Sequence, residues 1–96
     1  MDEMTKLAAL LEQSHVPYEV RDHWSNTKQI CYPNCENVVC DAVCFPGSYG
    51  YSDGLLEIMG LVDEEEVGDT VEGWLSAVEV FQRIYKHYRY ELYSMI

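Results

Sequence analysis

Four cysteines, separated by three, four and three residues, are the first side chains to consider for chemistry: Cys31, Cys35, Cys40 and Cys44. Structural zinc usually takes cysteines two or four residues apart. If Cys40 and Cys44 share a strand, their Cα atoms lie about 13 Å apart at ~3.3 Å per residue. Two thiolates on one zinc ion must lie within about 4 Å of each other. We therefore interpret the cysteines as small buried side chains and predict no metal and no cofactor.

Other residue types that could support catalysis do not form a recognisable motif. A cysteine nucleophile needs a nearby base and an electropositive setting, whereas this chain is acidic and its three histidines have no motif spacing. His87 lies among basic residues, as is typical of a helix surface. Asp53 and Glu57 are the carboxylates to consider as an acid–base pair, and ordinary solvation explains them better. We predict that the protein is not an enzyme.

A dense acidic segment indicates binding instead. DNA carries about one negative charge per 1.7 Å of helix axis, so closely spaced carboxylates can occupy a basic nucleic-acid channel. The alternative is a connector that is simply solvated. Tyr49 and Tyr51 lie in a glycine-rich loop and could add contact area at an interface, or the loop could pack back on its own sheet. The candidate partner-binding residues are Asp63, Glu64, Glu65, Glu66, Asp69, Glu72, Tyr49 and Tyr51.

These side chains must be positioned by elements around Asn37 to Phe45, the segment with the clearest strand pattern. Its alternate positions are apolar on both faces. Such a strand belongs in the middle of a sheet with each face covered. Asp41 is the residue there that needs a polar partner.

The remaining pattern predicts helices at both ends of the chain and further strands between them. Ser76 and Glu79 form a capping box that begins the second helix. Val71 and Trp74 are expected to anchor the last strand. The expected helices are Asp2–Ser14 and Ala77 to about Tyr90, and the other strands are Tyr18–Asp22, Thr27–Tyr32, Leu55–Val62 (with a short helix as the competitor) and Thr70–Leu75. The fold class is therefore α+β: one domain, residues 1–96, with an antiparallel sheet of four to five strands and both helices packed on one face.

Composition limits the class of partner. The formal net charge is -11, from 17 acidic and 6 basic residues, and 48% of residues are hydrophobic. This balance disfavours direct contact with nucleic acid or an anionic membrane, and it favours a basic partner or simple solubility. The acidic start, Met1 to Met4, lacks the basic flank and apolar core of a signal peptide, so we expect a cytoplasmic protein.

Several short segments carry a resemblance to other proteins. They are Asn37–Asp41, Ser48–Gly50, Gly54–Leu61 and Gly73–Ala77, followed by Val80 and Phe81. In these segments the chain resembles small acidic uncharacterised proteins encoded by phages and prophages of Gram-positive gut bacteria. The resemblance implies a phage setting in a host bacterial cytoplasm, and it assigns no functional residue.

Together these observations predict a small acidic phage accessory protein that binds a basic or nucleic-acid-binding protein. One form of this hypothesis is an anti-CRISPR-like inhibitor of a host defence system that acts through a DNA-mimic surface. A second hypothesis is a protein that sequesters a nucleotide signal, which requires Arg21, Lys28 or the C-terminal basic residues to line its pocket. A third is a structural module that forms homo-oligomers through a sheet edge or the tyrosine-rich helix.

Overall fold

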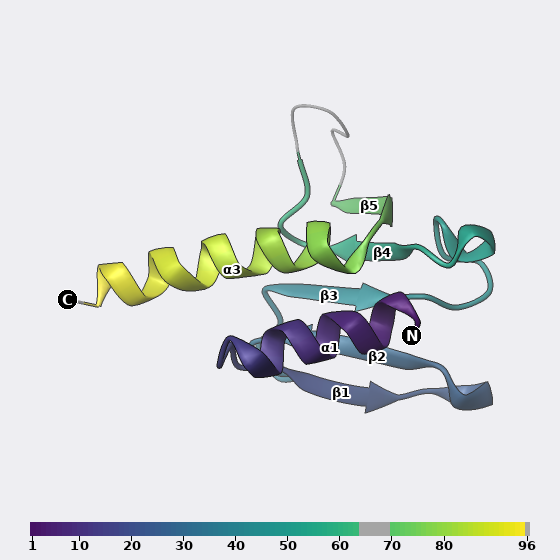
Figure 1. The fold of residues 1–96 in the computed structure, drawn as a ribbon, viewed down its shortest axis with the longest axis horizontal. Coiled ribbons are helices and arrows are strands. Elements are labelled where there is room, and N and C mark those ends of the chain that lie inside the picture. Colours follow the sequence, from purple (N-terminus) through teal and green to yellow (C-terminus); the bar gives the residue numbers. More distant parts are fainter. Residues whose placement is uncertain (64–69, 96) are drawn as a thin grey trace.

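The structure is a computed structural model that describes residues 1–63 and 70–95. These residues form an antiparallel five-stranded sheet with a helix at each end of the chain, so the predicted α+β fold is confirmed (Figure 1). The elements are α1 (Glu3–Gln13), β1 (Glu19–Asp22), the 3-10 turn η1 (Trp24–Asn26), β2 (Lys28–Tyr32), β3 (Cys40–Val43), the 3-10 turn η2 (Tyr51–Asp53), β4 (Leu56–Met59), β5 (Val71–Leu75) and α3 (Ala77–Ser94).

The strands follow one another across the sheet in chain order, and α1 and α3 pack together over one face. Ile30 of β2 lies opposite Ala42 of β3, which lies opposite Ile58 of β4. Because opposite residues in an antiparallel pair share a face, this row is directed at the helices. It forms one core with Leu7 and Leu11 of α1, which are fully buried.

The helix starts are fixed by side chains. The Asp2 carboxylate accepts the Thr5 N–H at 2.7 Å. The predicted capping box is confirmed, since Ser76 Oγ accepts from the Glu79 N–H and the Glu79 carboxylate accepts from the Ser76 N–H. The Glu3 carboxylate also accepts the Ala77 N–H at 3.0 Å, so the two helices begin in contact.

The strand expected at Asn37 to Phe45 is shorter than predicted. It holds the central position, and Asp41 has a polar partner in Gln29, whose amide donates to it at 2.8 Å. However, β3 begins at Cys40, and Val38 and Val39 are 43% and 38% exposed. The Asn34 side chain accepts the N–H groups of residues 36 and 37, which extends the turn into Asn37, the first residue of the expected strand.

Two further expectations change in detail. The segment Leu55–Val62 is a strand as predicted, but β4 ends before Gly60, which has a φ of +84°. Trp74 was expected to anchor β5, and this is wrong because its side chain is 58% exposed, whereas Leu75 is buried. Within the described residues, no helix is both long and apolar enough to cross a membrane.

Candidate binding surface

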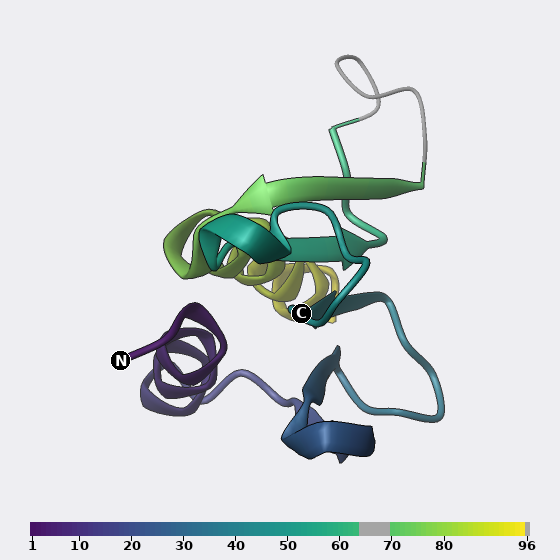
Figure 2. The same cartoon turned by 90° about the vertical axis from the view of Figure 1, so that its right-hand side faces the viewer.

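The loop that joins β3 to β4 lies at one end of the sheet, beside η1 and the start of α1 (Figures 1 and 2). Its first turn is closed by Ser48, whose hydroxyl donates to the Phe45 carbonyl at 2.8 Å and accepts the Phe45 N–H. The Tyr49 N–H donates to the Glu57 carboxylate at 2.6 Å. The loop is therefore held to β4, and Glu57, which the sequence offered as half of an acid–base pair, serves here as the acceptor of a backbone hydrogen bond.

The same loop packs closely on β5. The Trp74 N–H donates to the Tyr49 carbonyl at 3.3 Å. A Cβ atom on Gly73 would lie 2.1 Å from the Tyr49 Cβ, and a Cβ atom on Gly50 would lie 2.9 Å from the Trp74 nitrogen. Glycine is thus required at both positions for the loop and the strand to touch.

Trp74 sits in a β-bulge. Leu56 lies opposite Leu75 and Ile58 lies opposite Glu72, so Glu57 alone faces both Gly73 and Trp74. Trp74 has a φ of +57°, a left-handed conformation that costs a non-glycine residue about 1–3 kcal/mol. Bulges of this kind redirect a side chain, and the Trp74 ring is 58% exposed.

Tyr49 and Trp74 form a stacked pair at this surface. Their ring centroids lie 5.5 Å apart with 18° between the planes, and the Tyr49 side chain is 54% exposed. We call these two residues the aromatic pair. The bulge, the two glycines and the Glu57 contact hold the aromatic pair in place, and both of its side chains are exposed.

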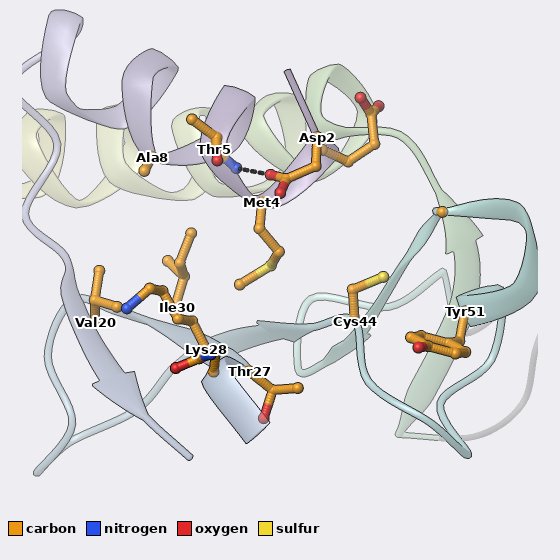
Figure 3. Close-up of a pocket in the computed structure, with 13 residues that line it drawn as sticks. Asp2, Met4, Thr5, Ala8, Val20, Thr27, Lys28, Ile30, Cys44 and Tyr51 are labelled. Atoms are coloured by element: carbon orange, nitrogen blue, oxygen red, sulfur yellow. Dashed lines mark hydrogen bonds between the residues drawn. The ribbon is translucent and has the colours of Figure 1, made fainter. Parts of the chain in front are cut away.

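Tyr51, two positions further along the same loop, lines a cavity of about 450 Å³ (Figure 3). Met4 and Ile30 line its apolar interior, with Lys28 on the β2 side and Tyr51 on the η2 side. Asp2 and Glu3 also line the cavity. The two tyrosines that the sequence grouped together therefore belong to different features.

The predicted acidic segment is described in part. Glu64, Glu65, Glu66 and Asp69 lie outside the described residues. The Glu72 carboxylate accepts two hydrogen bonds from Arg83, at 2.9 and 3.0 Å, and one from the Asp63 N–H. The Arg83 guanidinium lowers the pKa of Glu72. Because Arg83 neutralises it, Glu72 is poorly suited to imitate a phosphate.

Other side chains that could take part in catalysis are buried or make structural contacts. Burial raises the pKa of Cys40 to about 12, so this thiol is a weak nucleophile near neutral pH. The Tyr32 hydroxyl lies 2.7 Å from Nδ1 of His87, a contact that the surface interpretation of His87 missed. Among residues 1–63 and 70–95, no group of three or more His, Cys, Asp or Glu side chains could hold a metal ion.

Comparison with known proteins adds no relative: no family model, curated protein or solved structure matches this chain.

The aromatic pair could not be predicted from sequence patterns. Tyr49 was selected from loop composition, and Trp74 was expected, with Val71, to anchor a short regular strand. The Gly73 that precedes Trp74 is the signal that could have indicated a bulge.

Proposed function

We propose that this protein is a non-enzymatic binding protein that recognises a basic protein partner through the aromatic pair. The observation that carries the proposal is Trp74, an exposed ring held on a strained backbone at a bulge. Backbone strain of this kind clusters at functional sites, and tryptophan and tyrosine dominate the binding energy of protein interfaces.

The charge of the chain indicates the chemistry of the partner. With 17 acidic residues against 6 basic ones, the protein attracts positively charged surfaces and accelerates their association. An arginine guanidinium or a lysine ammonium also binds favourably over the face of a tryptophan ring. A basic partner is therefore attracted by the negative charge of the protein and can also bind over the rings of the aromatic pair.

The phage setting implied by the resemblance to small acidic phage proteins makes host nucleic-acid-binding proteins the first partners to test. In the DNA-mimic form of the proposal, residues 63–66 and 69 supply the carboxylates and the aromatic pair supplies the anchor. Glu72 is left out of this surface because it pairs with Arg83. Charge reversal at Glu64, Glu65 and Glu66 should abolish binding in the mimic form and only slow association otherwise.

The experiment compares quantitative capture from a bacterial lysate by three immobilised proteins, with and without competing duplex DNA. Trp74→Asn removes the ring and keeps a residue that tolerates positive φ, whereas Tyr90→Ala removes an aromatic side chain that is 68% exposed on α3. We expect at least one captured basic protein to be lost about tenfold or more with Trp74→Asn, and to be retained with Tyr90→Ala. Equal capture by all three proteins, or no capture, would overturn the proposal.

A second candidate function rests on the cavity beside Tyr51. Sequestering a nucleotide requires a basic residue at the pocket, and Lys28 and Tyr51 both line this one. Asp2 and Glu3 at the same cavity oppose a phosphate, which makes this the weaker candidate. Thermal-shift titration with a ribonucleotide panel tests it. A rise in melting temperature that Lys28→Ala and Tyr51→Ala both abolish would support it, and no shift would exclude it.

A further inference from the structure

The face of the sheet opposite the helices contains a buried thiol. Cys31 of β2 is fully buried, and its cross-strand neighbours are Glu19 on β1 and Asp41 on β3. Because residues directly opposite in an antiparallel pair share a face, Cys31 and Glu19 point to the same side. The thiol lies on the side of the sheet that the helices do not cover, so another segment must bury it.

That segment is the loop between β2 and β3, which returns over Cys31 and carries Cys35. The Cys35 N–H donates to the Glu19 carboxylate at 2.9 Å, and Arg21 donates to the Cys35 carbonyl at 3.3 Å. Two residues of β1 thus hold the backbone of Cys35 over the strand position next to Cys31. Burial is the larger cause of the raised pKa of the Cys31 thiol, and Cys35 thereby lies near enough to raise it as well.

The other two cysteines are placed differently. Cys40 is fully buried in the core beneath the helices, opposite Tyr32. Cys44 lines the cavity beside Tyr51. From the sequence, all four cysteines were interpreted alike as buried side chains. In the structure, Cys31 and Cys35 lie together on the face of the sheet that the helices do not cover.

We propose that Cys31 and Cys35 are a redox-active dithiol that forms a reversible disulfide with a disulfide oxidant such as oxidised glutathione. Cys35 is half-buried and Cys31 is fully buried, so the oxidant reaches Cys35 first. The Cys35 thiolate attacks one sulfur of oxidised glutathione and releases one glutathione thiolate. Cys31 then gives up its proton and attacks the Cys35 sulfur, which releases the second glutathione thiolate; the raised pKa of Cys31 makes this the slower of the two steps. The protein loses two protons and two electrons, and one glutathione disulfide becomes two glutathione thiols.

The product would tie the β2–β3 loop covalently to β2. In the reduced protein the contacts of Cys35 with Glu19 and Arg21 tie this loop to β1, an exposed strand. Oxidation adds a bond at the same point. The proposal is independent of the aromatic pair, which lies at the β3–β4 loop and β5, and it stands or falls separately from the proposed function.

The test is disulfide mapping of the full-length protein. The reduced protein is equilibrated with oxidised glutathione. It is then denatured in the presence of N-ethylmaleimide, which labels the free thiols, and is cleaved after glutamate. Cleavage after Glu19, Glu36 and Glu57 places Cys31 and Cys35 in peptide 20–36, and Cys40 and Cys44 in peptide 37–57. We expect peptide 20–36 to lack two hydrogen atoms and carry no label, while peptide 37–57 carries two labels. Two labels on peptide 20–36 would overturn the proposal.

Two variants test the order of attack. Cys31→Ala should leave glutathione attached to Cys35, because the resolving thiol is missing. Cys35→Ser should leave Cys31 reduced and labelled, because it is buried. Circular dichroism confirms that each variant is folded before oxidation. A Cys31→Ala protein that oxidises no more slowly than the wild type but retains no glutathione would also overturn the proposal.

Discussion

The Tyr32 hydroxyl and Nδ1 of His87 lie 2.7 Å apart and join β2 to α3 across 55 positions of the chain. The two rings meet edge to face, with centroids 5.6 Å apart, and Tyr32 is 2% exposed. His87 Nε2 in turn lies 3.7 Å from the Glu91 carboxylate. The contact between Tyr32 and His87 holds the long α3 helix over the middle of the sheet. Tyr32 is therefore an ionisable group that is buried between the sheet and this helix.

We expect the protein to lose stability at alkaline pH. Burial raises the pKa of Tyr32 and of Cys31 to about 12, from 10.0 and 9.0. The folded state therefore binds these protons more tightly than the unfolded chain. The free energy of unfolding should hold up to about pH 9 and fall from there to about pH 12. Guanidinium unfolding across this range provides the measurement.

The Tyr32→Phe variant separates the phenol from the thiols. Near neutral pH it should unfold about 1 kcal/mol more easily, because it lacks the hydrogen bond to His87. Above about pH 10 its stability should fall less steeply than that of the wild type, because one titrating group is gone. Parallel curves for the two proteins above about pH 10 would contradict the assignment of this loss to Tyr32.

Arg83→Met should destabilise the fold by roughly 1–3 kcal/mol, because it leaves the Glu72 carboxylate without its partner. That carboxylate is 13% exposed. The lowered pKa of Glu72 adds stability that is present above its ordinary value of 4.5 and is lost as pH falls through the folded-state value. The acid limb of the stability curve should therefore shrink in this variant.

Lys28→Met provides the matched control for that experiment. Lys28 pairs with Asp22, but the two side chains are 57% and 78% exposed. Exposed pairs contribute about 0–1 kcal/mol, so this variant should unfold much like the wild type. Equal losses in the two variants would show that the depth of the Glu72 pair is irrelevant.

Gly73→Ala should disrupt the aromatic pair. The added Cβ would lie 2.1 Å from the Tyr49 Cβ, so the β3–β4 loop must move away from β5. We expect increased acrylamide quenching of Trp74 in a Trp24→Phe background, in which Trp74 is the one remaining tryptophan. Gly54→Ala is the control, since Gly54 has positive φ but open space around it. Unchanged quenching in Gly73→Ala would contradict the close approach.

Trp74→Asn should preserve the stability of the fold while it removes the binding anchor. Asparagine relieves part of the left-handed strain at φ +57°, and this gain offsets the loss of the stack on Tyr49, worth about 0.5–1.5 kcal/mol. Denaturant midpoints for the variant and the wild type should agree closely. A large loss of stability would mean that Trp74 serves the fold, contrary to a recognition role.

The regular features of this fold were predictable because they depend on local patterns. The Ser76 cap, the helix that it begins and the strands β2 and β4 each follow from a few neighbouring residues. The aromatic pair was not predictable in the same way. A single bulge reverses the alternation of β5 and turns Trp74 outward, and alternation is the signal on which a strand prediction rests.

The predicted grouping of the candidate site residues differs from the structure for a similar reason. Spacing in the sequence grouped Tyr49 with Tyr51, and Glu72 with the acidic segment. In the folded chain Tyr49 stacks on Trp74, Tyr51 borders the cavity, and Glu72 pairs with Arg83. Each of these partners comes from another part of the chain, so no local spacing could indicate it.

The order of the strands also bears on how the chain folds. Every ladder joins strands that are consecutive in the sequence, so the sheet can assemble by zipping neighbours with little loop-closure entropy. The costly closure is the docking of α1 against α3, where Glu3 meets Ala77 across 74 positions. If that docking comes last, Leu7→Ala should accelerate unfolding far more than it slows refolding in stopped-flow experiments. The helices at the two ends of the chain would then dock onto a sheet that is already formed.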